Sequence, residues 1–195
     1  MINENCPCKK KKCPRRGDCI ACRSYHAQSK RKRPVYCDKK IVIRKFCKGD
    51  EIQISEVIRQ TLTVSNSKDY PTEYINENIK SHSPEVMAKR AEKSHFYVVL
   101  DGKRIIGCGG ITGYWGSTTE SYLVSVFVLP EYQRRDIGRR IIDTLEADEY
   151  FLRAWRTEVA SSLTAVNFYR KMGYEYKGGN TLPDELGVVR LEKRK

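Results

Sequence analysis

The stretch from Val126 to Arg140, VFVLPEYQRRDIGRR, combines residue types that can hold an anion. It begins as an apolar strand and passes through a proline into a turn, and Gly138 lies in the first turn of an expected helix. A helix N-terminus presents unpaired backbone N–H groups and a partial positive charge, and a glycine lets a ligand approach that backbone. The pattern predicts an anion site, and a diphosphate fits it best. The arginines around it are Arg134, Arg135, Arg139 and Arg140.

The cysteines near the N-terminus are a second group whose spacing suits chemistry. A C-x2-C pair followed by a histidine and a further cysteine is typical of zinc ligands. The candidate ligands exceed one tetrahedral site, so one zinc with spare thiols, two zincs and an iron–sulfur cluster all stay open. The alternative without metal is a disordered basic tail with reactive thiols. The candidate ligands are Cys6, Cys8, Cys13, Cys19, Cys22, His26 and Cys37.

The charge of the chain is concentrated at its N-terminus. The 195 residues carry a formal net charge of +13. Residues 1–48 hold 16 Lys/Arg and 3 Asp/Glu, whereas residues 49–195 hold 21 of each. The basic stretch Ser29–Pro34 would suit nucleic acid or another polyanion, and a solvated surface is the alternative.

The composition divides the chain into two parts. Residues 1–38 contain almost no Leu, Ile, Val or Phe, so hydrophobic burial cannot hold them and a metal would have to. We expect a cysteine-rich module at 1–38 and a second domain at 39–195. No segment approaches the roughly 20 apolar residues of a membrane span, and no signal peptide is evident. The sequence therefore predicts a cytoplasmic protein, where clustered cysteines bind metal rather than form disulfides.

The second part alternates expected helices and strands. Two β-rich runs flank Asp101-Gly102, which is a strong hairpin signal. The apolar residues of 136–151 share one helical face, and a serine start and glycine stop bound a helix at 161–173. This order predicts a mixed α/β domain of about 150 residues. Further strands are expected at 40–46, 121–129, 153–160, 174–179 and 186–193, and further helices at 50–62, 70–82 and 83–93.

Two motifs of this domain resemble the GNAT superfamily of N-acetyltransferases. The family has a strand ending in V-x-P, then Tyr, then Q/R-x-x-G-x-G/A, and it has A-x-x-F-Y-x-K-x-G-F/Y near the C-terminus. The resemblance covers about residues 41–195 and implies a central, mostly antiparallel mixed sheet flanked by helices. The matching residues are Val128, Pro130, Tyr132, Gln133 and Gly138 for the first motif, and Ala165, Phe168, Tyr169, Lys171, Gly173 and Tyr174 for the second.

The resemblance also implies acetyl-CoA as the acetyl donor. The diphosphate would lie on the turn before the helix, and the pantetheine arm along the signature strand, which splays from the next strand in this family. A backbone N–H near Phe127 would contact the thioester carbonyl. Ser162 stands where the family often has an asparagine at the cofactor, although it would also serve as a helix cap. The other implied contacts are Val126, Val128, Gln133, Arg134, Arg135, Asp136, Ile137, Gly138, Arg139 and Tyr169.

Asp136 departs from the family pattern, which usually has glycine at this position. Its carboxylate would stand beside the expected diphosphate. We expect Asp136 to cap the helix through its side-chain oxygen. The alternative is weakened cofactor binding, partly offset by the nearby arginines.

The resemblance implies two catalytic candidates. Tyr169 stands where family members often protonate the departing thiolate, and a phenol with a pKa near ~10 is a suitable donor. Its alternative role is a core aromatic on one helical stripe. Glu120, at the start of the signature strand, is the candidate base, although the exact register places Tyr122 there. An exposed strand-end glutamate is the alternative.

The sequence thus favours an N-acetyltransferase that moves acetyl from acetyl-CoA to a primary amine by direct attack. The identity of the amine is not predicted. The alternative is a metalloprotein that binds nucleic acid or another polyanion and whose GNAT domain has lost activity, which Asp136 would permit. A third possibility combines both, with the module delivering the enzyme to an anionic partner.

Overall fold

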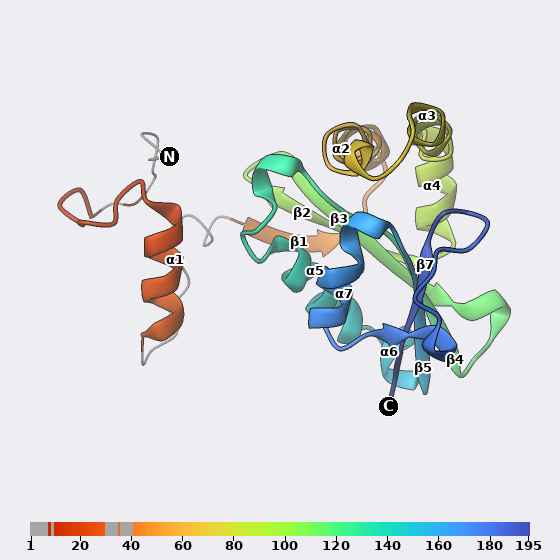
Figure 1. Cartoon of the computed structure of the whole chain (residues 1–195). Coiled ribbons are helices and arrows are strands. Elements are labelled where there is room, and N and C mark those ends of the chain that lie inside the picture. The colour runs from red at the N-terminus through yellow and green to blue at the C-terminus, as the bar shows by residue number, and fades with distance from the viewer. Residues whose placement is uncertain (1–7, 9, 30–34, 36–40) are drawn as a thin grey trace. The chain divides into compact units, whose positions relative to one another are not determined.

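The computed structural model describes residues 8, 10–29, 35 and 41–195. The chain forms two compact units, one from residues 1–42 with 101–103 and one from residues 43–100 with 104–195 (Figure 1). In the first unit, Asp18 caps helix α1 (Cys19–Gln28) by accepting from the Ala21 N–H at 2.9 Å. The guanidinium of Arg15 lies 3.8 Å from the centroid of the Tyr25 ring.

From Ile41 onward the chain alternates helices and strands in the predicted order. The helices after α1 in the described residues are α2 (Asp50–Val64), α3 (Thr72–Lys80), α4 (Pro84–Glu92), α5 (Ile137–Glu146), α6 (Glu149–Arg153) and α7 (Val166–Lys171). The strands are β1 (Ile41–Lys45), β2 (His95–Asp101), β3 (Arg104–Gly113), β4 (Glu120–Val128), β5 (Arg156–Ser161), β6 (Glu175–Tyr176) and β7 (Val189–Arg194).

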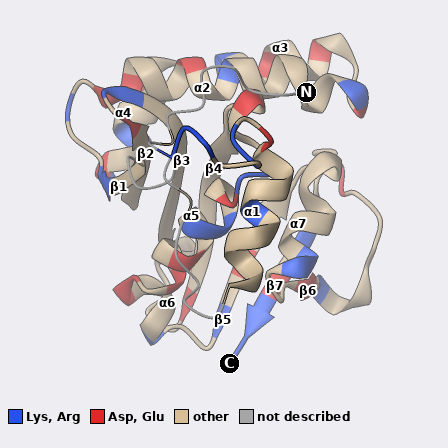
Figure 2. Ribbon diagram, turned by 90° about the vertical axis from the view of Figure 1, so that its left-hand side faces the viewer, with Lys and Arg blue, Asp and Glu red and all other residues tan. Residues whose placement is uncertain are grey.

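One sheet of seven strands runs through the domain in the order β1-β2-β3-β4-β5-β7-β6. The pairs β3–β4, β5–β7 and β6–β7 are antiparallel, and β4–β5 is parallel. Helices α2, α3 and α4 lie on one side of the sheet and α5 and α6 on the other (Figures 1 and 2). The predicted mixed, mostly antiparallel sheet flanked by helices is confirmed.

Helix α5 packs closely on β3 because that strand carries glycines on the facing side. A Cβ on Gly109 would stand 2.7 Å from the Cγ2 of Ile141, and one on Gly107 would stand 3.3 Å from its Cδ1. The buried face of α5 contains Ile137, Ile141 and Leu145, as the helical spacing predicted. The glycines therefore let α5 lie close against β3.

The expected helix at 136–151 is wrong in one respect, because Asp148 divides it. Helix α5 ends at Glu146, and the Asp148 side chain accepts from the Tyr150 N–H to begin α6. The same buried carboxylate accepts from the Tyr97 hydroxyl at 2.7 Å and bonds His95 Nδ1 at 2.9 Å. Because these partners lie about fifty residues away in sequence, the helical periodicity alone does not reveal the break.

Candidate functional site

The parallel seam between β4 and β5 is paired at one end and open at the other. Ladder pairs run from Glu120 with Arg156 to Leu123 with Val159, and none follows within the described residues of the two strands. A cleft of about 480 Å³ opens there, lined by β4 from Tyr122 to Phe127 and by parts of α2, α3, α4, β5 and α7. The seam therefore divides into a closed end, residues 120–123 with 156–159, and an open end at 124–128.

A bulge in β4 marks the start of the open end. Phe127 pairs with Cys108 but Val124 pairs with Gly110, so β4 has one extra residue there. Ser125 lies in the bulge and has a φ of 49°, a backbone conformation that residues other than glycine rarely adopt. Bulges re-aim side chains beside functional sites. Cys108 is fully buried beneath the bulge and donates to the Ser125 carbonyl at 3.4 Å.

The turn between β4 and α5 contains two left-handed residues. Arg134 has φ 58° and Asp136 has φ 59°, both in the region that favours glycine. This explains why a glycine suits position 136. Left-handed residues within a turn direct successive N–H groups toward a common point, where an anion binds. Arg134, Asp136 and Arg139 are exposed, and Arg135, Gly138 and Arg140 partly so.

The expected helix cap at Asp136 is wrong. Asp136 occupies the N-cap position of α5, but its side chain forms no capping hydrogen bond. In the left-handed conformation its side chain does not reach the first N–H groups as an extended N-cap residue does. The N-terminal amides of α5 therefore do not contact their own cap side chain.

Gln133 and Gly138 have structural partners of their own. The Gln133 amide donates to the Val128 carbonyl at 3.0 Å and to Ser65 Oγ at 2.9 Å, which holds the turn against the end of β4. A Cβ on Gly138 would stand 3.1 Å from the Phe168 ring of α7. Gly138 thus also allows α5 and α7 to meet.

Tyr169 of α7 lines the cleft. It is 5% exposed, and burial raises the pKa of its phenol well above the usual range, so the group keeps its proton at neutral pH. No hydrogen bond to its hydroxyl occurs within the described residues 41–195. Its ring also packs edge-on against Phe168 and Tyr174. Tyr169 is therefore both a core aromatic and a residue of the cleft lining.

Family comparison agrees with this geometry. Residues 92–176 match the model of the acetyltransferase (GNAT) domain. This segment is a GNAT acetyltransferase domain. The match includes the open end of the seam, the turn before α5 and Tyr169. Comparison with curated protein sequences gives no match.

Solved structures share the fold of the GNAT domain. The PaiA N-acetyltransferase of Thermoplasma acidophilum in complex with coenzyme A is 19% identical with a TM-score of 0.68, covering 80% of this chain and 99% of that one. A GCN5-related N-acetyltransferase of Rhodopseudomonas palustris is 20% identical with a TM-score of 0.66, covering 79% and 95%. An aminoglycoside 6'-N-acetyltransferase complexed with coenzyme A is 18% identical with a TM-score of 0.58, covering 78% and 96%.

The predicted cofactor contacts of the GNAT domain fall into two places. Val126, Phe127, Ser162 and Tyr169 line the cleft. Ser162 forms no side-chain cap, so its alternative role as a helix cap is wrong. The remaining contacts, Val128 and 133–139, lie at the end of β4, in the turn that follows and in the first turn of α5, outside the cleft lining.

Glu120 lies at the closed end of the seam and not in the cleft lining. Its carboxylate accepts from Arg156 at 2.7 Å, and this hydrogen bond lowers the pKa of Glu120. A carboxylate held in an ion pair is a weak proton acceptor. The placement weighs against Glu120 as the base.

Two residues of the cleft lining, His82 and Arg90, were not predicted from the sequence as site residues. Burial lowers the pKa of His82 to about 4, and its Nδ1 lies 2.8 Å from the Asn78 carbonyl. Because a carbonyl only accepts, Nδ1 carries the proton and Nε2 keeps its lone pair. Arg90 Nη1 donates to Ser125 Oγ at 2.5 Å. Both residues come from the helical region 72–92, where no motif signals them.

The cysteine-rich region gives no metal site within the described residues. No group of three or more His, Cys, Asp or Glu side chains there could hold a metal. Two of the seven candidate ligands, Cys6 and Cys37, lie outside the described residues. The structure therefore does not support the predicted zinc. In the described part of the chain, no helix has both the length and the apolar character that a membrane crossing requires.

Proposed function

We propose that the GNAT domain binds acetyl-CoA at the open end of the seam and transfers its acetyl group to an amine. The observation that carries the proposal is the end of pairing after Leu123 and Val159, which is followed along β4 by a bulge and then by a turn with two left-handed residues. Bound acetyl-CoA would supply an acyl thioester, which is already activated toward an amine. Two fold neighbours bind coenzyme A, which favours this ligand.

The turn before α5 would hold the diphosphate. The left-handed conformations at Arg134 and Asp136 and the uncapped start of α5 offer backbone N–H donors. The side chains of the turn add positive charge, and Arg134 and Arg139 are exposed to solvent. The Asp136 carboxylate is negative and would repel the diphosphate. Diphosphate binding therefore depends on the balance between this repulsion and the attraction of the arginines.

The edge of β4 would hold the acyl-bearing arm. Val126 and Phe127 lie in the cleft lining, past the last ladder pair with β5. An unpaired strand edge offers N–H and C=O groups to an extended ligand. This arrangement would place the thioester near the bulge at Ser125, with the acceptor entering from the side of α3 and α4.

Tyr169 would supply the proton of direct attack. The amine nitrogen bonds to the acetyl carbon, the carbon–sulfur bond breaks, and the departing thiolate takes the Tyr169 proton. The nitrogen loses its proton to solvent, because His82, whose pKa burial lowers to about 4, is a weak proton acceptor. Proton exchange with solvent restores Tyr169. Glu120 is not assigned a role because Arg156 holds it at the closed end.

Acetyl-CoA binding tests the proposal directly. A ligand that binds only the folded protein at 100 times its Kd stabilises it by about 2.7 kcal/mol, so a rise in Tm is expected. Release of free thiol with a panel of amines then measures transfer. No change in Tm at millimolar acetyl-CoA would contradict the proposal and favour a domain that has lost activity.

The cysteine-rich region keeps two predictions of its own. Zinc binding is measured by metal analysis of the full chain purified without chelator, and a zinc-to-protein ratio near zero would contradict it. Binding of nucleic acid or another polyanion is measured by salt-dependent titration with an oligonucleotide. A slope of zero against salt concentration would contradict an electrostatic site.

A further inference from the structure

Arg90 is a half-buried cation at the acceptor side of the cleft. It extends from α4 to the bulge of β4, where its guanidinium donates to Ser125 Oγ at 2.5 Å, and a longer bond of 3.5 Å reaches the Ser81 carbonyl. Guanidinium has five N–H donors, so these two bonds leave three for a ligand. Burial lowers the pKa of Arg90, which shows that its charge has lost part of its hydration.

Arg90 has no carboxylate partner in the described part of the domain. Within the described residues 41–195, it forms no ion pair with Asp or Glu, and the cleft lining contains neither residue type. The nearby His82 is neutral, so Arg90 carries the positive charge at this place. A partly desolvated charge without a counter-ion is costly unless a ligand supplies that ion.

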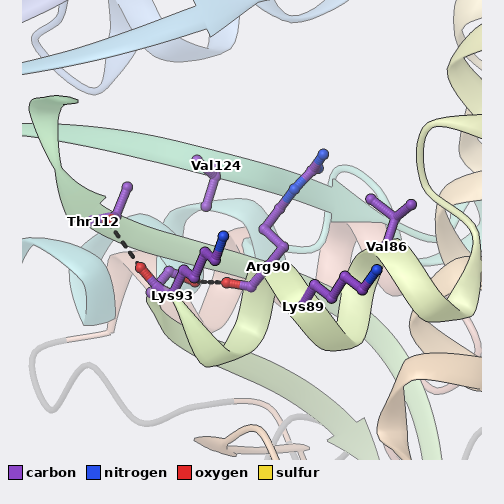
Figure 3. Close-up of a pocket in the computed structure, with 7 residues that line it drawn as sticks. Val86, Lys89, Arg90, Lys93, Thr112 and Val124 are labelled. Carbon is purple, nitrogen blue, oxygen red and sulfur yellow. Dashed lines mark hydrogen bonds between the residues drawn. The ribbon is translucent and has the colours of Figure 1, made fainter.

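A second, shallower pocket of about 310 Å³ continues the same charge along α4. It shares Arg90 and Val124 with the cleft and is lined also by Lys89 and Lys93. Figure 3 shows Lys89 and Arg90 of α4 and Lys93 at its C-terminal end, beside Thr112 and Val124 of the adjacent strands. This lining likewise contains no Asp or Glu, and neither lysine forms an ion pair within the described residues.

We infer that the acceptor amine also carries an anionic oxygen group, a carboxylate or a phosphate, which Arg90 binds. The planar guanidinium matches either group in a bidentate geometry, and hydrogen bonds to charged groups are the stronger kind. Lys89 and Lys93 would bind further anionic groups of a longer acceptor. A polycationic amine would be repelled by the positive side chains of both pockets, whose linings contain no carboxylate. This inference rests on the proposed acetyl transfer.

Matched pairs of amines test the inference in the full chain. Glycine is compared with glycine methyl ester for the carboxylate, and phosphoethanolamine with ethanolamine for the phosphate, by thiol release from acetyl-CoA. We expect the anionic member of at least one pair to have a kcat/KM at least ~10-fold higher. The pair that shows the difference identifies which anion is recognised. Equal kcat/KM within both pairs, or a preference for spermidine, would overturn the inference.

Arg90→Gln should remove this preference while the rise in Tm with acetyl-CoA is kept. The matched control is Arg59→Gln, which removes one positive charge from the exposed surface of α2, outside both pockets. It should keep the preference. A preference that persists in Arg90→Gln would overturn the inference even if the variant is as active as the original chain.

A direct binding measurement covers the case of an acceptor outside the panel. N-acetylglycine and phosphoethanolamine are added to the chain with coenzyme A, and their effect on Tm is compared with that of N-methylacetamide and ethanolamine. We expect a rise with an anionic probe that Arg90→Gln abolishes. No difference between anionic and neutral probes would overturn the inference. Loss of the acetyl-CoA effect itself would instead contradict the proposed function.

Discussion

The two ends of the β4–β5 seam each hold a half-buried or buried arginine, and the two arginines have opposite surroundings. At the closed end, Arg156 donates to Glu120 at 2.7 Å, Glu158 at 2.8 Å and Glu192 at 3.1 Å. At the open end, Arg90 donates to a serine hydroxyl and a carbonyl and meets no carboxylate within the described residues. A neutralised cation of β5 thus lies at one end of the seam, and an uncompensated cation of α4 lies at the other.

The difference separates structural charge from binding charge. Glu158 is 1% exposed and also accepts from Lys177 at 2.7 Å, so the closed end is a saturated network with no capacity for a ligand. The open end combines an unpaired strand edge, a bulge and the Arg90 guanidinium, which has N–H donors left for a ligand. A charged group that has no counter-charge inside the protein is a candidate for ligand binding. A charged group whose hydrogen-bond partners are all protein side chains supports the fold.

Loss of Arg156 should have the largest effect on stability. Arg156→Met takes one counter-charge from Glu158 and from Glu192, which keep Lys177 and Arg194 as partners, and removing one partner of a buried pair costs up to about 3–5 kcal/mol. Urea unfolding measures the change. Arg90→Met is the matched comparison and should cost under about 1.5 kcal/mol, since it leaves no carboxylate unpaired. Equal losses in the two variants would remove the distinction between the ends.

Tyr169→Phe should separate chemistry from binding at the open end. The variant keeps the ring packing and removes only the hydroxyl, so kcat should fall about 100-fold while the Kd for acetyl-CoA stays the same. Steady-state kinetics and calorimetry provide the two numbers. Phe168→Leu, which alters packing beside Gly138 without touching the hydroxyl, serves as the control. Unchanged kcat in Tyr169→Phe would remove the residue from the mechanism.

His82 should make the open end sensitive to acid. Its folded pKa of about 4 lies below the ordinary value near ~6.5, so the unfolded chain binds more protons between these values. The stability that depends on neutral His82 is therefore complete above about pH 6.5 and is lost as the pH falls toward 4. We expect a loss of about 1 kcal/mol between pH 7 and pH 5.5. His82→Gln should flatten this part of the unfolding profile, and an unchanged profile would contradict the assignment.

Asp136 should produce the smallest effect. Asp136→Asn keeps a side chain that tolerates the left-handed conformation and removes only the negative charge near the turn. We expect about fivefold tighter acetyl-CoA binding, which corresponds to about 1 kcal/mol. Asp136→Gly adds the backbone effect, so comparing the two variants separates charge from conformation. Equal Kd values for the original chain and Asp136→Asn would show that the carboxylate does not reach the ligand.

The sequence determined the parts of the molecule whose partners are close along the chain. The V-x-P strand end, the turn before α5 and the helix that carries Tyr169 depend on local backbone preferences and on helical spacing, so the motifs locate them. The left-handed conformation at position 136 was not predicted. The helix cap at Asp136 failed because that conformation turns the side chain away from the amides it was expected to reach.

Only the tertiary structure decided which charges are free to act. Glu120 is held by Arg156, thirty-six residues away. Arg90 contacts Ser125 across a similar sequence separation, and it meets no Asp or Glu among residues 41–195. Helix α5 ends where Asp148 finds partners in β2. Whether a charge is neutralised depends on side chains that folding brings together. These pairings cannot be predicted from the spacing of residues along the chain. The domain could therefore be recognised from the sequence, but the side of the cleft that would select the acceptor could not.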